Sequence, residues 1–318
     1  MNIVVLDGFA LNPGDLSWEN MKKLGDCIIY DRTKPEEVFD RIHYAEAIIT
    51  NKVVIDQSLM DRLPDLRYIG VTATGYNVVD VRAAGERNIL VTNIPAYSTD
   101  SVAQLVFSHI LNIANRVEFH SNSVKAGDWI VNPDFAYWKT PQMEIAGKTL
   151  GIIGLGQIGQ KVAEIAEAFG MKVIFQNRSL KNNIPKAWIQ KSLTEVFSES
   201  DFISLNCPLT NENSAFVNQN LLQTMKSTAV LINTGRGGLI HEADLAKALN
   251  SGVIAAACLD VLSTEPPSTD NPLISARNCF ITPHVAWATF EARQRLMNIA
   301  VDNLKCFLSG NRQNMVKA

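Results

Sequence analysis

The feature that most constrains this sequence is a glycine motif placed between a short apolar run and a helical pattern. Thr149–Ile153 leads directly into Gly154-Leu155-Gly156-Gln157-Ile158-Gly159, and a second apolar run, 172–175, follows the helical stretch. In such a turn Gly154 permits the tight bend, Gly156 lets the backbone approach a diphosphate, and Gly159 lets helix and strand pack closely. The diphosphate would lie on free N–H groups at the helix N-terminus. The motif in this setting predicts a βαβ unit that binds a dinucleotide.

The end of the second strand is where such a unit contacts the ribose of its cofactor. A carboxylate at this place binds the 2′-hydroxyl of NAD. The sequence has Gln176-Asn177-Arg178-Ser179 there instead. Asn177 can bond a ribose hydroxyl, whereas Arg178 and Ser179 could accept a 2′-phosphate. The sequence therefore predicts a dinucleotide cofactor and leaves both NAD and NADP open.

Short apolar runs alternate with longer amphipathic stretches along the whole chain. Runs of four to six residues without polar alternation indicate strands buried on both faces, as in parallel sheets covered by helices. The runs form two blocks, and a length of 318 residues at roughly 150 per domain also indicates two domains. We expect an α/β fold with two parallel-sheet units rather than one barrel. The expected strands are 3–6, 27–30, 47–50, 67–71 and 90–92, then 149–153, 172–175, 202–206, 229–233, 255–259 and 279–282.

The gap between the two blocks holds a helical pattern and an aromatic segment. Ser101-Val102-Ala103-Gln104 has capping-box spacing, and the apolar stripe that follows predicts one helix of five or six turns ending before Gly127. Residues 128–138 are rich in aromatic side chains without a clear period. They could form a loop over the core or an arm that buries its rings on a partner subunit. A last helix is expected from about 290 to 309, and it could pack on either block.

The composition excludes several classes of protein. Hydrophobic residues make up 47% and charged residues 19%, which excludes extended disorder. Lys plus Arg number 29 against 32 for Asp plus Glu, a net charge of −3 that is too even for a nucleic-acid or membrane-surface binder. No apolar window is long enough to span a membrane, and the segment 1–8 is typical of a first strand rather than a signal peptide. Five scattered cysteines without zinc spacing predict free thiols in a reducing cytoplasm, and no metal site is expected.

Polar groups follow three of the later strands, at the edge where open α/β sheets bind their ligands. Arg236 stands on a glycine-flanked turn, Asp260 and Glu265 come just after a strand, and His284 ends another strand. Taken singly, these could be a surface turn residue, a solvated carboxylate and a structural imidazole. Their occurrence together in one dinucleotide-binding domain favours a common catalytic site.

The same segments carry a family resemblance. The chain resembles the D-isomer-specific 2-hydroxyacid dehydrogenases, whose glycine fingerprint, arginine turn, Leu-Asp-Val…Glu-Pro segment and Thr-Pro-His segment all occur here in order. Residues 71–77, 93–97, 144–151 and 284–289 are similar to the glycerate dehydrogenase (hydroxypyruvate reductase) branch. The match covers nearly the whole chain.

The resemblance implies two Rossmann-like or flavodoxin-like domains, with the cofactor domain inserted into the substrate domain. Residues 1–99 and 287–318 would form the substrate domain, and residues 100–286 the cofactor domain. Members of the family are typically homodimers that pair through their cofactor domains, which would make 129–138 part of a dimer arm. The partners would then be a small-molecule acid and a second copy of the chain, with no nucleic acid and no membrane.

The resemblance also assigns site residues. Arg236, Glu265 and His284 would be catalytic, and Asp260 would bond the nicotinamide carboxamide. Backbone N–H groups of Ala73, Thr74 and Gly75 would hold the substrate carboxylate with Arg236. Val102 would be a nicotinamide neighbour or a residue of the apolar core. The full set of expected cofactor-binding residues is Val102, Gly154, Gly156, Gln157, Ile158, Gly159, Asn177, Arg178, Cys207, Pro208, Thr234, Gly235, Arg236, Asp260, His284 and Ala286.

The chemistry of the three catalytic candidates suits reduction of a 2-oxo acid. Histidine titrates near neutrality, so His284 can give a proton to the carbonyl oxygen and take it back. Glu265 would bond the far ring nitrogen, orient the ring and favour the imidazolium. Arg236, permanently charged and forked, would bind the carboxylate and polarise the carbonyl.

Three functional hypotheses follow. The first is hydride transfer between NAD(P)H and hydroxypyruvate or D-glycerate, with glyoxylate as a second substrate. The second keeps the mechanism but assigns another D-2-hydroxy acid, of lactate type or 3-phosphoglycerate. The third is an NAD-sensing binding protein on the same scaffold. The small polar segment 74–77 favours a small hydroxylated substrate, and the complete Arg, Glu and His set favours an enzyme.

Overall fold

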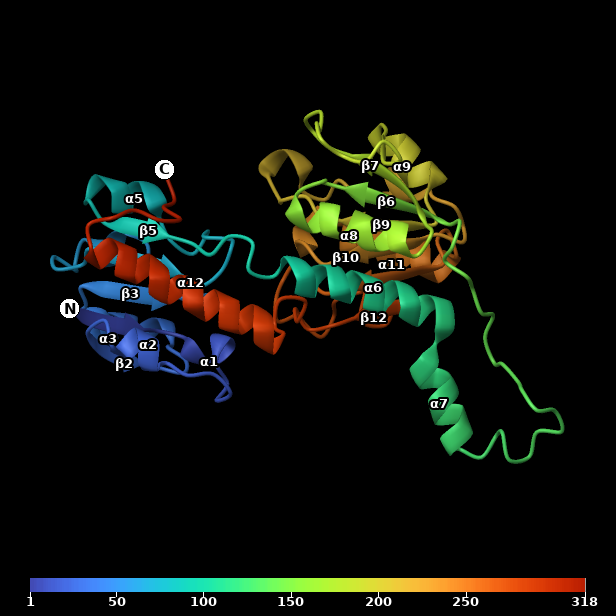
Figure 1. Cartoon of the computed structure of the whole chain (residues 1–318), viewed down its shortest axis with the longest axis horizontal. Coiled ribbons are helices and arrows are strands. Elements are labelled where there is room, and N and C mark those ends of the chain that lie inside the picture. Colours follow the sequence, from blue (N-terminus) through green and yellow to red (C-terminus); the bar gives the residue numbers. More distant parts are fainter. Residues whose placement is uncertain (318) are drawn as a thin grey trace. The chain divides into compact units, whose positions relative to one another are not determined.

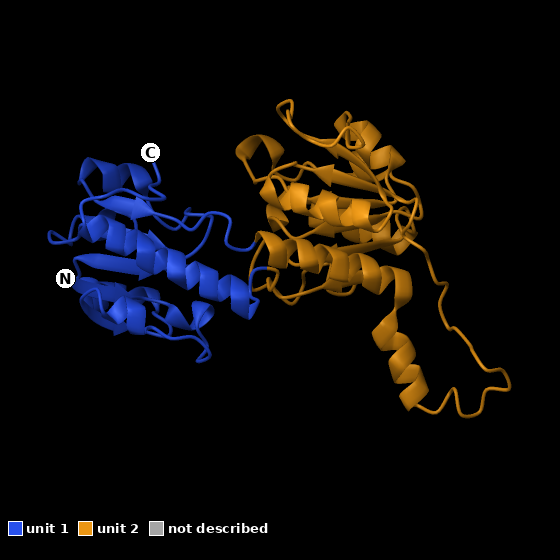
Figure 2. Cartoon of the chain, viewed as in Figure 1, with its two compact units in different colours: residues 1–98, 287–318 blue, residues 99–286 orange. Residues whose placement is uncertain are grey.

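The computed structural model describes residues 1–317, which form two compact units (Figure 2). One unit consists of Met1–Ser98 and Trp287–Ala318, and the other is the continuous stretch Thr99–Ala286 between them. Each unit contains one sheet of parallel strands. The expected fold class, α/β with two parallel-sheet units of which one is inserted into the other, is confirmed.

The sheet of the first unit has the strand order β2-β1-β3-β4-β5, which is a flavodoxin-like order (Figure 1). Strands β3 and β4 are buried along their whole length, as their unbroken apolar runs predict. The strands are β1 (Asn2–Val5), β2 (Asp26–Ile29), β3 (Ala47–Thr50), β4 (Tyr68–Val71) and β5 (Leu90–Thr92). The helices are α1 (Gly8–Leu11), α2 (Glu19–Lys22), α3 (Val38–Ile42), α4 (Gln57–Met60), α5 (Val81–Glu86) and α12 (Phe290–Leu308), with a 3-10 turn η1 (Pro35–Glu37).

The last helix, α12, packs in the first unit. It contacts β4, and Leu296, Ala300 and Leu304 on one of its faces are buried in the same apolar cluster as Tyr68. Beyond the helix the chain returns to the sheet, where the N–H of Val316 donates to the carbonyl of Val91 in β5 at 2.9 Å. The tail therefore adds an irregular edge to this sheet.

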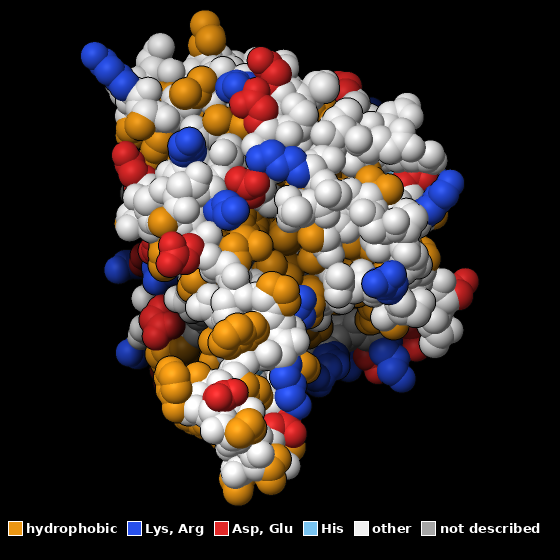
Figure 3. Space-filling view, turned by 90° about the vertical axis from the view of Figure 1, so that its right-hand side faces the viewer, with side chains coloured by type: hydrophobic (Ala, Val, Ile, Leu, Met, Phe, Trp, Pro, Cys, Tyr) orange, Lys and Arg blue, Asp and Glu red, His pale blue; other side chains and the backbone are white. Residues whose placement is uncertain are grey.

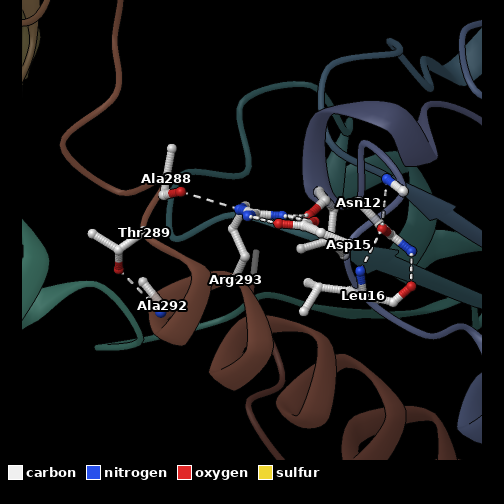
Figure 4. Close-up of polar contacts among 9 residues, drawn as sticks. Asn12, Asp15, Leu16, Ala288, Thr289, Ala292 and Arg293 are labelled. Atoms are coloured by element: carbon white, nitrogen blue, oxygen red, sulfur yellow. Dashed lines mark hydrogen bonds and ion pairs between the residues drawn. The ribbon is translucent and has the colours of Figure 1, made fainter.

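A bidentate ion pair joins the first turn of α12 to the N-terminal segment (Figure 4). Arg293 is 8% exposed, and its two terminal nitrogens donate to the carboxylate oxygens of Asp15 at 2.7 and 2.6 Å. The same guanidinium donates to the carbonyl oxygens of Leu11 and Ala288. These contacts hold the pKa of Asp15 below its usual value, chiefly through the hydrogen bond from Arg293.

The sheet of the second unit has the order β12-β11-β10-β9-β6-β7-β8. The chain moves outward from β6 to β7 and β8, then returns to β9 and continues outward on the other side, so the order reverses between β6 and β9. The strands are β6 (Thr149–Ile153), β7 (Lys172–Gln176), β8 (Ile189–Gln190), β9 (Phe202–Leu205), β10 (Val230–Asn233), β11 (Ala256–Leu259) and β12 (Cys279–Ile281). The helices are α6 (Thr99–Asn115), α7 (Val117–Lys125), α8 (Gln157–Ala168), α9 (Leu193–Glu199), α10 (Gln219–Leu222) and α11 (Glu242–Ser251), with 3-10 turns η2 (Asn211–Asn213) and η3 (Gly237–Leu239).

The single long helix expected between Ser101 and Gly127 is wrong. Two helices occupy this stretch, because Arg116 adopts a left-handed backbone with φ of 47° between α6 and α7. Helix α6 begins at Thr99, so Ser101 lies inside the helix rather than capping it. The apolar stripe of α6 packs against α8, whereas Val117 is 69% exposed. The apolar stripe has no core to pack against beyond Arg116, and this explains why the helix does not continue straight.

Helix α7 and residues 126–142 extend from the second unit as an arm (Figure 1). Its tip is strongly apolar and exposed, with Ile130 at 87%, Val131 at 82% and Phe135 at 92% exposure. Figure 3 shows hydrophobic side chains gathered on this arm, at the bottom of the view. Of the two structures considered for the aromatic segment, the chain adopts an arm and not a loop over the core.

Among the helices of residues 1–317, none combines the length and the hydropathy needed to cross a membrane. All five cysteines carry free thiols. No group of His, Cys, Asp and Glu side chains within the described range is arranged to hold a metal ion.

Candidate active site

Most of the residues expected at the site lie at one edge of the sheet of the second unit. All its strands are parallel, so their carboxyl ends share this edge. The glycine motif follows β6, Asn177 and Arg178 follow β7, Cys207 and Pro208 follow β9, Thr234, Gly235 and Arg236 follow β10, Asp260 follows β11, and His284 follows β12. The point at which the strand order reverses, between β6 and β9, lies within this row.

The glycine turn after β6 leaves room for a diphosphate. Gly154 has φ of +93°, and a Cβ there would lie 2.7 Å from the backbone nitrogen of Cys207, so only glycine fits where β6 and β9 end. A Cβ on Gly159 would collide with the carbonyl oxygen of Gly154. A Cβ on Gly156 would meet no atom within 4 Å. Gly156 is also the N-cap of α8 and no side chain caps this helix, so the N–H groups of Gln157 and Ile158 are open to an anion.

Asn177 links the glycine turn to the loop after β7. Its side-chain oxygen accepts the N–H of Leu155 at 3.1 Å, and its side-chain nitrogen donates to the carbonyl of Ser179 at 2.8 Å. Asn177 therefore shapes the turn through contacts with the protein itself. Arg178 is exposed next to it, and the loop presents no carboxylate at the place where NAD-specific units carry one.

Two buried oxygens at this edge have no hydrogen-bond partner within residues 1–317. They are Oγ1 of Thr234, a residue that is 8% exposed, and Oδ1 of Asn206. Burying a polar atom without a partner costs stability, so such atoms point to an external ligand or water. They follow neighbouring strands beside the glycine turn. Together with the open space at Gly156, they show that these residues fit a nucleotide cofactor.

A buried asparagine shapes the arginine turn. The side-chain nitrogen of Asn233 donates to the carbonyl of Arg236 at 2.9 Å, and its oxygen accepts the N–H of Gly235 at 3.0 Å. The guanidinium of Arg236 is exposed, donates to the carbonyl of Gly235 at 2.8 Å, and pairs with no carboxylate of the described chain. Most of its forked donors are thus free to bind an anion.

His284 and Glu265 form a close pair. Nδ1 of His284 lies 2.6 Å from Oε2 of Glu265, and an ionised carboxylate only accepts, so this ring nitrogen is the donor. The other carboxylate oxygen of Glu265 accepts the N–H of Leu262 at 3.0 Å, which fixes the carboxylate. The His284 side chain is 31% exposed, and its Nε2 bonds to no atom of residues 1–317. The ring is therefore oriented on one side and available for proton transfer on the other.

Asp260 holds the turn that carries His284. The residue is 1% exposed, and its Oδ1 accepts the hydroxyl of Thr282 at 2.6 Å and the N–H of Val285 at 2.8 Å. Its Oδ2 accepts the N–H of Ala286 at 2.8 Å. The backbone N–H of His284 donates to the Asp260 carbonyl at 2.8 Å. The carboxylate predicted to contact the cofactor thus also supports the catalytic histidine candidate.

The loop of Ala73, Thr74 and Gly75 belongs to the first unit, where it follows β4. The carbonyl of Ala73 accepts the N–H of Ile94 at 3.0 Å, and the hydroxyl of Thr74 donates to the carbonyl of Ile94 at 2.9 Å. The backbone N–H groups of the three loop residues donate to no acceptor within the described chain. Free, adjacent N–H groups are what binding of a carboxylate requires.

The other expected contact residues have evident structural surroundings. Val102 is 6% exposed on α6, as a core residue would be, and Ala286 is buried beside Asp260. Burial raises the pKa of the Cys207 thiol, so this cysteine stays protonated at neutral pH. The carbonyl of Pro208 accepts the side-chain nitrogen of Asn213 at 2.8 Å.

Sequence reasoning missed three polar residues of this edge, namely Asn206, Asn233 and Thr282. Each lies at or directly after the carboxyl end of a strand of this sheet, of which β9 and β10 are buried and β12 is half-buried. A polar residue that closes a buried apolar run needs hydrogen-bond partners, and that rule could have singled them out. Which partners they find depends on neighbouring strands.

Comparisons with known proteins identify the family of this chain. Residues 107–286 match the family model of the D-isomer specific 2-hydroxyacid dehydrogenase, NAD binding domain. A hydroxypyruvate reductase of Blautia hydrogenotrophica is 48% identical over 323 residues, which cover 99% of each chain. The chain belongs to the D-isomer specific 2-hydroxyacid dehydrogenases.

Two further relatives of this dehydrogenase are informative. A glycerate dehydrogenase of Methylorubrum extorquens is 40% identical over 286 residues, 89% of each chain. The solved structure of an NADPH-dependent glyoxylate/hydroxypyruvate reductase from Sinorhizobium meliloti, in complex with NADP and malonate, superposes with a TM-score of 0.82. It is 28% identical and the match covers 99% of this chain and 96% of that one. The family resemblance expected from the sequence is confirmed, and the dehydrogenase is an NAD(P)-dependent oxidoreductase.

Proposed function

We propose that this dehydrogenase transfers a hydride between NAD(P)H and hydroxypyruvate, forming D-glycerate, and that it also reduces glyoxylate. The observation that carries the proposal is the 2.6 Å pair of His284 and Glu265, at the same sheet edge as the glycine turn that fits a dinucleotide. The 48% identity to a hydroxypyruvate reductase supports the choice of acid.

In the proposed mechanism, the glycine turn after β6 would hold the nicotinamide cofactor, which would supply the hydride for the carbonyl carbon of the oxo acid. His284 donates a proton from Nε2 to the carbonyl oxygen, while Glu265 keeps the ring oriented through Nδ1. The free guanidinium of Arg236 binds the carboxylate and polarises the carbonyl. The unpaired N–H groups of Ala73, Thr74 and Gly75 provide a second grip on the carboxylate.

The two units take different roles in this proposal. Residues 100–286 would be the cofactor domain, with the glycine turn and the catalytic side chains. Residues 1–99 and 287–318 would be the substrate domain, with the 73–75 loop.

Initial rates would test the function directly. The purified enzyme is assayed with hydroxypyruvate, glyoxylate, pyruvate and 3-phosphohydroxypyruvate, each with NADH and with NADPH. We expect hydroxypyruvate and glyoxylate to give the highest kcat/KM, and the two cofactor arms assign the preference between NAD and NADP. A marked preference for pyruvate would assign a lactate-type acid as the substrate instead. A marked preference for the phosphorylated acid would assign 3-phosphoglycerate. Cofactor binding without turnover of any acid would favour an NAD-sensing protein.

His284→Ala provides the matched test of the mechanism. Loss of the proton donor should cost at least about 3 kcal/mol of transition-state stabilisation, roughly a hundredfold in kcat/KM. Cofactor binding itself should persist, because the glycine turn is intact, and fluorescence titration with NADH or NADPH would show this. Turnover close to wild type in this variant would rule out His284 as the proton donor.

Two further properties belong to the proposal. The dehydrogenase would be a homodimer paired through its cofactor domains, because the exposed apolar arm of residues 117–142 needs a partner surface. It would act in the cytoplasm, where its five free thiols stay reduced.

A further inference from the structure

We propose that three asparagines of the first unit, Asn93, Asn303 and Asn314, are positioning residues that aim the backbone N–H groups of the 73–75 loop at the substrate carboxylate. This rests on the proposed role of that loop. The three asparagines act through the loop backbone. Asn93 directly follows β5, Asn303 lies in α12, and Asn314 lies in the C-terminal tail.

The loop is held by its carbonyl groups. The carbonyl of Thr72 accepts the side-chain nitrogen of Asn51 at 2.6 Å, and that of Ala73 accepts the N–H of Ile94 at 3.0 Å. The carbonyl of Thr74 accepts the side-chain nitrogen of Asn93 at 2.8 Å. Three successive carbonyls are thus bound by donors of the same unit.

Because the peptide bond is planar, these contacts of the carbonyl groups also fix the directions of the N–H groups. In a trans peptide the C=O of one residue and the N–H of the next point in opposite directions. Fixing the carbonyls of residues 72, 73 and 74 therefore fixes the direction of the N–H groups of Ala73, Thr74 and Gly75, each opposite to the carbonyl of its own peptide. None of the three N–H groups has an acceptor in the described chain, so they are held in set directions and stay available to a ligand.

A ring of hydrogen bonds supports the asparagine that holds Thr74. The side-chain nitrogen of Asn303 donates to the carbonyl of Asn93 at 3.1 Å, and the N–H of Asn93 donates to the carbonyl of Asn314 at 3.2 Å. The side-chain nitrogen of Asn314 closes the ring by donating to Oδ1 of Asn303 at 2.9 Å. Each member donates to one neighbour and accepts from the other.

Burial of the Asn303 side chain restricts the ring of hydrogen bonds to one arrangement. Asn303 is 1% exposed and lies in α12 next to Leu304, a residue of the apolar core. A buried amide is tolerated only with its bonds satisfied, so the ring has one low-energy arrangement. Asn314 has φ of +50°, a conformation that asparagine tolerates better than most residues, and this directs its carbonyl to Asn93. The C-terminal tail thereby fixes the position of the 73–75 loop.

Two variants test the proposal at different distances from the loop. Asn93→Ala removes the bond to Thr74 and keeps the backbone contacts of residue 93. Asn314→Gly keeps the left-handed backbone and the carbonyl, and removes only the side-chain donor to Asn303. Asn298→Ala, at an exposed position of the same helix as Asn303, is the matched control.

The readout is the separation of KM from kcat and from cofactor binding. We expect Asn93→Ala to raise KM for hydroxypyruvate at least about fivefold, the effect of one lost hydrogen bond, and Asn314→Gly to raise it about twofold. The cofactor dissociation constant and the KM of the control should stay at their wild-type values. A lowered melting temperature with an unchanged KM in both variants would show a purely structural role and overturn the proposal.

Hydrogen exchange separates this proposal from the proposed function. In the wild-type and variant enzymes, exchange is measured without substrate for the amides of Thr72 and Ile94, whose N–H groups donate to the carbonyls of Thr50 and Ala73 at 2.8 and 3.0 Å. We expect exchange of these two amides to accelerate in both variants while that of the control stays unchanged. If the wild type reduced no 2-oxo acid, the proposed function would be wrong. The exchange result would still test whether the three asparagines hold the 73–75 loop. Unchanged exchange in both variants would refute the positioning role.

Discussion

Two glycines of the turn after β6, Gly156 and Gly159, differ in what surrounds them. At Gly159 an added Cβ would strike the carbonyl of Gly154, so this glycine is needed for the fold. At Gly156 an added Cβ would enter open space, in front of the helix N-terminus where a diphosphate would bind. Packing therefore requires Gly159, as it requires Gly154, and the ligand requires Gly156.

A pair of alanine variants should separate these two requirements. Gly159→Ala should lower the free energy of unfolding by about 1–3 kcal/mol, because the backbone must shift to relieve the contact. Gly156→Ala should leave the melting temperature near the wild-type value and weaken cofactor binding at least tenfold, about 1.4 kcal/mol. Thermal unfolding without cofactor and fluorescence titration with NADH or NADPH measure the two effects. Equal cofactor affinity in Gly156→Ala and wild type would contradict the placement of the diphosphate.

At the scale of elements, α12 shows how a terminal helix is tied to a sheet formed by the other end of the chain. One of its faces packs on β4, and Arg293 in its first turn binds Asp15 with both nitrogens. The apolar spacing of α12 is visible in the sequence. The partner of Arg293 is not, because Asp15 lies 278 residues away.

The ion pair makes stability depend on pH in a defined direction. Because Arg293 lowers the pKa of Asp15 in the folded state, the pair stabilises the fold above the ordinary aspartate value, about pH 4, and this contribution is lost as pH falls through the lower folded value. Asp15→Asn should therefore melt below wild type at pH 7, and the difference should shrink as the pH falls below about 4. Glu19→Gln, in an exposed pair with Lys22, is the control and should show almost no difference. A gap that widened on acidification would contradict the assignment.

At the scale of the whole molecule, the arm is the feature that the core of one chain does not explain. Ile130, Phe135 and Trp138 are 87%, 92% and 71% exposed, and no packing within the unit requires them. Such residues become energetically important when a partner buries them.

Replacing two of these residues should therefore change the oligomeric state. We expect the wild type to be a dimer by light scattering, and the double variant Ile130→Ser with Phe135→Ser to dissociate at least a hundredfold more readily, with its circular dichroism unchanged. Leu180→Ser, which alters an 84% exposed residue outside the arm, should remain dimeric. A monomeric wild type, or a double variant as tightly paired as the wild type, would argue against the dimer proposal.

Local pattern was enough to predict much of this protein. Unbroken apolar runs predicted the parallel strands, since strands buried on both faces need no alternation. The glycine motif between β6 and α8 predicted a dinucleotide turn, and the polar residues after β10, β11 and β12 predicted which side chains would share an edge. These inferences succeed because each depends on a few neighbouring residues, or on the fact that parallel strands end together.

Only the tertiary structure decided the rest, because the deciding contacts join residues far apart in the chain. The expected helix breaks at Arg116, where the core that covers its apolar stripe ends. No residue near Arg116 in the sequence indicates that the core ends there. Asp260 supports the turn of His284 from 24 residues away, and Asn303 reaches Asn93 across 210 residues. The sequence by itself thus determined the class of fold and the kinds of chemical group at the site. The folded chain decided which of those groups are held in place and which remain free for a ligand.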